Sequence, residues 1–301
     1  MKKQITLVSL IVVFSAVYGQ DYIPYWNLRN GADSAMYHKD YDVALGKLGQ
    51  AIGSVPYVHS DTYRKAAICA VKEKQLENGY GFIKLAIQGG TLPHFWQHGD
   101  VKKALASSAF YASMEDSADI WHQQHLASIH MEYRALVDSM YYIDQRILRN
   151  NLTVKGDYQV DKDLGKSDQN VDSMLFHTLL GAIEKWGFPS EEIIGREGNQ
   201  KASIIIHHNV RLPENHGYFP LFEKALKEGA YLPKDYAWAY DQGRMWIEEE
   251  PVFYYGVAPP LVITEEKIME IDQARRKYGI KPFSSTKVMK RGKATKTVFL
   301  W

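Results

Sequence analysis

The sequence has one cysteine, almost no net charge and no intact catalytic motif. Each of these features excludes a way of stabilising the fold, a class of partner or a class of reaction. Cys69 is the single cysteine in 301 residues, so no disulfide can form within the chain. Thirty-six basic and thirty-five acidic residues leave a net charge of +1, which gives no general attraction to nucleic acid or to an anionic membrane. A phosphate-binding glycine loop, a nucleophile elbow and a calcium loop are also missing. Packing must therefore hold the fold, and no motif names a reaction.

Residues 1–19 have the three-part pattern of a cleaved secretory signal. Lys2 and Lys3 precede an apolar run from Ile5 to Val13, and small residues follow as far as Gly19. This order is typical of an export signal, and the apolar run is too short to cross a bilayer. Cleavage would leave Gln20 first, with no cysteine there to accept a lipid. We therefore predict an exported protein, periplasmic or secreted, without a lipid anchor or a membrane span after cleavage.

Residues 20–115 predict a module of helical hairpins that resembles a tetratricopeptide repeat. The pattern consists of Tyr41, Ala44, Leu48, Ala51 and Ile52, echoed 35 residues later by Ile83, Ala86 and Ile87. The shift is close to the repeat period of about 34 residues, and small alanines let paired helices approach closely. Cys69, within the apolar run 66–71, is expected to be a small buried residue rather than a nucleophile. The module is either a groove for a protein or peptide partner or a structural cap on the second domain.

Residues 116–301 predict a second, helical domain, so the fold class is mainly α. Glycine and proline between 89 and 99 interrupt the first helical pattern and place the boundary near residue 115. The predicted helices cover residues 117–150, 168–186, 199–210, 220–228, 233–247 and 265–278. Residues 252–263 alternate in a way that predicts at most a short hairpin, and lysines and arginines at 287–296 form a basic tail.

One carboxylate lies on the predicted inward face of the helix at 117–150. Asp144 follows Met140 by four residues and precedes Leu148 by four, so the helical period places all three on one side. A buried charge requires a partner. We therefore expect Asp144 to form a buried polar contact.

Between Asp144 and Gly279 the chain resembles a bacterial family catalogued as domain of unknown function 6624. The residues that carry the resemblance are Asp144-Gln145-Arg146, Asp168, Asn170, Trp186-Gly187-Phe188-Pro189, Gly195, Ile204-Ile205-Ile206-His207-His208, Asp241, Tyr255-Gly256, Asp272, Arg275 and Gly279. The resemblance implies a mostly helical domain and supplies no substrate.

The chain also departs from the pattern of this family. Asp241 and Arg244 are separated where family members tend to have an adjacent Asp-Arg pair, and Phe253, Val257 and Ala258 stand where they tend to have Gln, Thr and Gln. Three polar side chains suited to ligand contact are thus apolar here. The resemblance therefore does not imply a shared chemistry.

Six polar residues on four predicted helices form a candidate catalytic site: Asp144, Arg146, Asp168, His208, Asp241 and Arg244. In the functional interpretation His208 is a general base, one carboxylate orients its ring and an arginine holds an anionic group. The same His and Asp set would suit a divalent ion. In the structural interpretation Asp168 caps a helix and Asp144 pairs with an arginine. His207 and His208 lie about 100° apart on a helix, so at most one of them faces any given site.

Two functions follow from these observations. The first is a binding or scaffolding component of the bacterial envelope, whose candidate partner is a protein or peptide held by the N-terminal module. The alternative is a hydrolase or transferase that uses His208, Asp144 and Asp241, with or without a metal. The sequence names no cofactor, and nucleic acid is not an expected partner.

Overall fold

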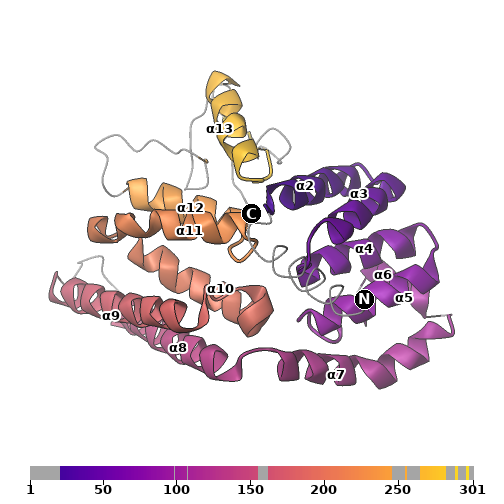
Figure 1. The fold of residues 1–301 in the computed structure, drawn as a ribbon, viewed down its shortest axis with the longest axis horizontal. Coiled ribbons are helices and arrows are strands. Elements are labelled where there is room, and N and C mark those ends of the chain that lie inside the picture. Colours follow the sequence, from indigo (N-terminus) through magenta and orange to yellow (C-terminus); the bar gives the residue numbers. More distant parts are fainter. Residues whose placement is uncertain are drawn as a thin grey trace, which may run out of the picture.

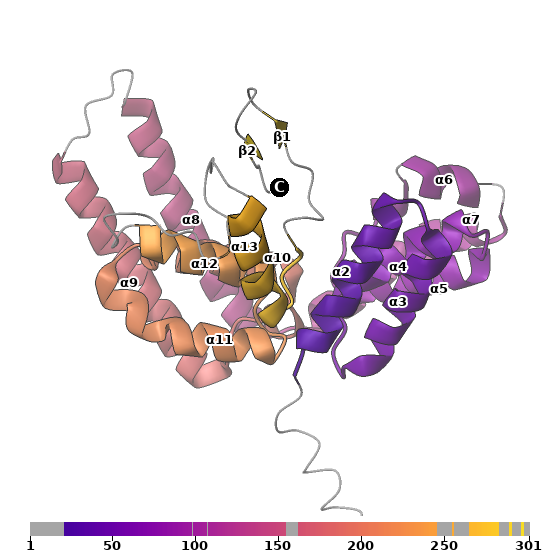
Figure 2. The same cartoon turned by 90° about the horizontal axis from the view of Figure 1, so that it is seen from above.

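The computed structural model describes residues 21–97, 99–106, 108–154, 162–245, 255, 265–282, 289–290 and 296–297. The fold is mainly α, as predicted: N-terminal helical hairpins pack on a C-terminal helical domain (Figures 1 and 2). The predicted signal at 1–19, nearly all of 252–263 and most of the basic tail lie outside the described residues.

The N-terminal helices form two consecutive hairpins. They are α2 (Ile23–Tyr37), α3 (Tyr41–Ser54), α4 (Ser60–Lys72) and α5 (Leu76–Gln88). Within each hairpin a short link contains a lysine with positive φ, Lys39 at 65° and Lys74 at 61°. These lysines are 74 − 39 = 35 residues apart, the same shift that relates the apolar patterns of α3 and α5. The internal repeat in the sequence is therefore a repeat of the hairpin.

Small buried residues let the hairpin helices pack closely. Ala44, Leu48 and Ala51 of α3 and Ile83 and Ala86 of α5 are fully buried. Cys69 of α4 is also fully buried, and burial raises the pKa of its thiol to about 11. The thiolate is therefore disfavoured at neutral pH, which fits the expected packing role.

The predicted helix over 117–150 is two helices, α7 (Phe110–Ser128) and α8 (Met131–Val154), with the extended residue Ile129 between them. The break lets the His130 amide donate to the Ile193 carbonyl at 2.7 Å. Helix α7 packs on α5 and shares a core with it, including Met114 and Trp121. The predicted boundary near residue 115 falls inside α7, which the 3-10 helix η1 (Phe95–Gln97) and α6 (Gly99–Leu105) precede.

The remaining elements build the C-terminal domain. They are α9 (Lys162–Trp186), α10 (Glu191–Asn209), the 3-10 helix η2 (Pro213–Tyr218), α11 (Phe219–Lys227), α12 (Pro233–Met245) and α13 (Glu265–Lys277). Strands β1 (Met289–Lys290) and β2 (Lys296–Thr297) pair antiparallel within the basic tail, with Met289 opposite Thr297. Helices α8, α9 and α10 pack against one another.

Two helix starts differ from the predictions. Helix α9 begins at Lys162, so Asp168 lies inside the helix and the prediction that it caps the N-terminus is wrong. Helix α10 begins at Glu191 rather than near 199, because Gly195 joins two helical segments at a kink with φ 74° and ψ 162°. Its first segment is capped by Ser190, whose side chain accepts from the Ile193 amide at 3.2 Å. Gly195 is itself non-helical and ends the first short segment, and the second segment is the helix that the sequence pattern predicted near 199–210.

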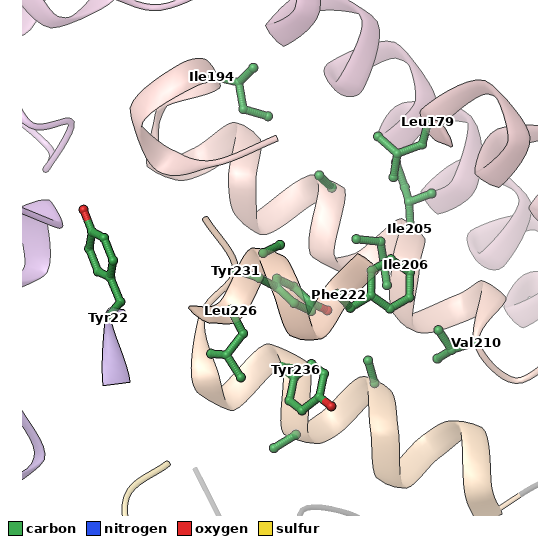
Figure 3. Packing of buried hydrophobic residues seen from close by; sticks show 14 of the residues in the cluster. Tyr22, Leu179, Ile194, Ile205, Ile206, Val210, Phe222, Leu226, Tyr231 and Tyr236 are labelled. Carbon is green, nitrogen blue, oxygen red and sulfur yellow. The ribbon is translucent and has the colours of Figure 1, made fainter. Parts of the chain in front are cut away.

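One apolar core joins the two halves of the chain. Leu179 of α9, Ile205 and Ile206 of α10 and Phe222 of α11 meet at its centre (Figure 3). Tyr22, directly before α2, belongs to the same buried cluster. Tyr25 and Trp26 of α2 join it there, whereas most buried residues of the hairpins form two clusters of their own.

A buried polar contact reinforces this junction. Glu191, at the first position of α10, accepts a hydrogen bond from the Ser60 amide at 2.7 Å and lies 3.3 Å from His59 Nδ1. The other ring nitrogen of His59 donates to the Gly229 carbonyl at 2.9 Å. Burial alone would raise the pKa of Glu191, but the hydrogen bond and charge of His59 outweigh it and lower that pKa. The carboxylate also lies at the N-terminus of α4, where a helix favours negative charge.

Two glycines allow the halves to approach closely. Gly229 has a φ of 77°, and a side chain there would lie 2.4 Å from the ring of Tyr22. Gly279 has a φ of 63°, and a side chain there would lie 2.5 Å from Trp26. Its carbonyl accepts a hydrogen bond from the Asn30 side chain at 2.8 Å. Only glycine satisfies both the backbone and the space at these positions.

The Glu191 contact predicts a specific loss of stability. Glu191→Ala leaves His59 and the Ser60 amide without their buried partner and should lower the free energy of unfolding by about 3 kcal/mol. Because the pKa of Glu191 is lowered in the folded protein, this stabilisation exists above the ordinary glutamate pKa and is lost as the pH falls through the folded value. Urea unfolding at pH 7 and at acidic pH measures both effects.

The neighbouring Glu192 is a matched control because its side chain is exposed. Glu192→Ala should change the free energy of unfolding by less than about 0.5 kcal/mol. Equal losses in the two variants would contradict a structural role for the buried carboxylate.

Candidate functional site

Two of the six predicted site residues meet directly. Asp144 of α8 is 3% exposed, as its helical position predicted, and its Oδ1 lies 2.6 Å from His208 Nδ1 of α10. Its Oδ2 accepts from the Gln145 side chain at 2.8 Å. The described partner of the buried Asp144 is thus His208, as in the functional interpretation, and not the arginine of the structural interpretation. A carboxylate at one ring nitrogen fixes the tautomer of an imidazole and leaves the other nitrogen for chemistry.

Asp172 of α9 completes a cluster with this pair. One ligating atom from each of Asp144, Asp172 and His208 can be chosen so that all three lie within 4.8 Å of one another. Asp172 and His208 are half-buried, so the cluster is open on one side. Helical spacing in the sequence places Asp172 on the inward face of α9, because Phe176 and Leu179, four and seven residues later, are core residues of this helix. Asp172 was not among the predicted site residues.

Asp241, another predicted site residue, lies in a different network. Asp241 of α12 is fully buried and accepts from the Tyr255 amide at 2.9 Å. Arg275 of α13 donates to the Tyr255 carbonyl at 2.6 Å. Burial lowers the pKa of this guanidinium to about 10, while the charges of Asp241 and Asp272 oppose that shift. This network anchors Tyr255 between α12 and α13, so the carboxylate that converges with Asp144 and His208 is Asp172 and not Asp241.

The last three candidates are not brought to the His208 cluster by any contact that the structure describes. Arg244 lies over Tyr240 of its own helix, with Cζ 5.7 Å from the ring centre and Nη1 3.3 Å from the hydroxyl. Arg146 is exposed on α8. Asp168 lies within α9, and its side chain falls outside the described residues.

A cleft of about 890 Å³ lies between the two halves of the chain. Its walls come from α2 and α4 on one side and from α10, α12 and the segment around α13 on the other (Figure 2). Apolar lining residues include Trp26, Ile204, Leu232, Trp238 and Ile280. The cleft could not be predicted from the sequence, because the residues that line it are far apart in the chain.

Basic side chains outnumber acidic ones along the cleft. The basic residues are Arg29, Arg64, Lys65, Arg196, Lys234, Arg275 and Lys281, and the acidic residues are Asp33, Asp61, Glu191 and Asp235.

Asp61 has several basic partners, with contacts at 2.9 Å to Arg29, 2.7 Å to Arg64 and 3.2 Å to Lys65. Burial would raise the pKa of Asp61, but these charges hold it well below its usual range. Arg196 is farther from this carboxylate, at 3.8 Å. Asp33 shares Lys65 at 2.7 Å.

His207 lines the cleft and has one buried ring nitrogen without a described hydrogen-bond partner. Its side chain is 3% exposed, Nε2 donates to the Asp235 carbonyl at 2.9 Å, and the ring packs edge-on against Trp238. Nδ1 is buried and has no hydrogen-bond partner within the part of the chain that the structure describes. Burial lowers the pKa of His207 to about 3, so the ring is neutral at pH 7. With the proton on Nε2, Nδ1 is an acceptor that lacks a donor.

His207 and His208 therefore serve different places, as their angular separation on a helix predicted. His207 lines the cleft, whereas His208 contacts Asp144 of α8.

Comparisons with family models, with curated proteins and with solved structures give no match for this chain. The resemblances to the uncharacterised family and to the tetratricopeptide repeat therefore stay predictions. None of the described helices has both the length and the apolar character needed to cross a membrane.

The neutral state of His207 predicts a pH-dependent stability. The folded pKa of about 3 is below the ordinary value of 6.5, so the unfolded chain binds the extra proton first and stability falls as the pH drops from about 6.5 towards 3. Between pH 7 and pH 5 this residue should account for about 2 kcal/mol of lost stability. Urea unfolding of wild type and His207→Gln across this range measures the difference.

His38, which is exposed at the end of α2, provides the matched control. His38→Gln should keep the pH dependence of the wild type. If His207→Gln keeps it as well, His207 is charged in the folded protein and is not an unsatisfied acceptor.

Proposed function

We propose that this protein is a binding component that holds an acidic peptide segment in the cleft between its N-terminal hairpins and its C-terminal domain. The observation that carries the proposal is the composition of the cleft, whose lining combines apolar residues such as Trp26 and Trp238 with seven basic residues against four acidic ones.

The charges of the cleft favour an acidic ligand. Lys234 and Lys281 form no ion pair with the described residues, and Arg196 has only a distant one at 3.8 Å. Burial raises the pKa of Asp235 to about 6, so the repulsion between this carboxyl and an anion decreases as the pH falls towards that value. Carboxylates on the ligand would pair with these cations at the cleft rim, where complementary charge contributes mainly to specificity.

The apolar residues of the cleft favour a peptide over a small inorganic anion. Trp26 and Trp238 come from opposite halves of the chain, and Leu232 and Ile280 lie on the same lining. Aromatic and aliphatic side chains bind apolar groups, whereas the polar groups around them set the orientation of a ligand. An acidic peptide with apolar side chains matches both the basic and the apolar residues that line the cleft.

Export is the second part of the proposal. The pattern of residues 1–19 supports cleavage after Gly19 and a periplasmic or secreted location without a lipid anchor. An exported binding protein of this kind would act as a scaffolding component of the envelope. Mass spectrometry of the exported protein, with an expected N-terminus at Gln20, tests the location separately from the binding.

Selection from a random peptide display library tests the binding. The immobilised wild-type protein should enrich peptides rich in Asp and Glu, and salt should weaken the binding because exposed charge pairs are screened. Arg196→Gln combined with Lys234→Gln should weaken a selected peptide about fivefold for each lost contact of about 1 kcal/mol. Fluorescence anisotropy with the labelled peptide measures this change.

Lys185→Gln is the matched control, because Lys185 is an exposed lysine outside the cleft. It should leave the affinity unchanged. Selection of no peptide, or of basic peptides, would contradict the proposal.

A further inference from the structure

We propose that Asp144, Asp172 and His208 form a binding site for a divalent cation that joins α8, α9 and α10. This site is independent of the peptide cleft, because none of its three residues lines that cleft. The proposal begins from the convergence of two carboxylates and one imidazole from three helices.

The spacing of these residues suits a shared ion. Their ligating atoms lie within 4.8 Å of one another, and an ion held at about 2.0–2.2 Å from each ligand requires ligating atoms within roughly twice that distance. Long helices that pack along their length hold such side chains in place, which is how helical bundles build metal centres. Small side-chain adjustments are therefore enough to close the site.

The three residues differ in burial in a way that suits a metal site open to water on one side. Asp144 is 3% exposed and the side chain of His208 is 17% exposed. Asp172 is half-buried at the open side. A cation would thus be anchored from the core and keep one or more positions for water.

The buried carboxylate also benefits from a cation. Asp144 has a hydrogen bond to His208 on one oxygen and to Gln145 on the other. A positive ion would compensate its charge more completely than hydrogen bonds alone. The contact of 2.6 Å between His208 Nδ1 and Asp144 Oδ1 is a hydrogen bond. It leaves Nε2 of His208 as the ring nitrogen that is open to a cation.

The donor set indicates the class of ion. One imidazole nitrogen and two carboxylate oxygens suit zinc and similar first-row ions such as manganese or cobalt better than magnesium, which keeps more of its water. With positions left for water, such an ion would supply the Lewis acid that hydrolysis or group transfer requires.

Titration of the full chain with Zn²⁺ alone, followed by calorimetry, tests the site. We expect one cation to bind per chain at pH 7, in a way that depends on these residues. Asp172→Asn and His208→Gln should each weaken binding by about tenfold or more. Co²⁺ should give a visible absorption band in the wild type that both variants lose.

Two further measurements keep the result interpretable. His177→Gln removes an exposed histidine of α9 near Asp172 in sequence and should bind Zn²⁺ like the wild type. Asp172 is half-buried, so Asp172→Asn should keep the circular dichroism and unfolding midpoint of the wild type. No binding by the wild type, or undiminished binding by either Asp172→Asn or His208→Gln, would overturn the proposed site.

Discussion

The structure depends on the junction that Glu191 makes between its two halves. Its carboxylate lies at the start of α10 and contacts the start of α4 through the Ser60 amide and His59. His59 extends the contact to the Gly229 carbonyl beyond α11. Three segments that are distant in sequence thus meet at one buried charge. Such a charge tolerates little displacement, because its solvation depends on every partner being in place.

The cleft is a consequence of this junction. The halves are held together at the base, where Glu191, His59 and the shared apolar core lie. Above it, α2 and α4 face α10 and α12 across side chains that pair only in part, such as Arg196 and Asp61 at 3.8 Å. The absence of a side chain at Gly229 and at Gly279 lets Tyr22 and Trp26 lie against the C-terminal half at this base. A rigid base with a charged opening is a suitable frame for recognising an extended ligand.

Local patterns in the sequence predicted the positions of the helices better than the contacts between them. The buried positions of α3 and α5 and the inward face of Asp144 follow from helical spacing, and all are buried. The predicted helix ends were wrong where the backbone conformation of one residue interrupts a helix. This occurs at Ile129 between α7 and α8 and at Gly195 in α10. Each break is stabilised by a tertiary contact, such as the bond from His130 to Ile193. A single sequence does not reveal contacts of this kind.

The candidate site shows the same limit. Asp144 and His208, both predicted site residues, do meet, but the carboxylate that lies beside them is Asp172 and not the predicted Asp241, because this depends on the rotation of α9 and α12 about their axes. The networks that hold Asp241 and the cleft both depend on distant segments. Residue types alone could name candidate site residues, but only the packing of the helices decides which of these residues meet.

Helix α10 links the two proposed sites through its geometry. After the kink at Gly195, one continuous helical segment carries His207 towards the cleft and His208 towards α8. A single residue inserted in this segment would rotate everything beyond it by about 100°. Both histidines would then leave their sites together. Insertions and deletions between Gly195 and His207 are therefore excluded in any descendant of this protein that keeps either site, whereas substitutions can alter one site and spare the other.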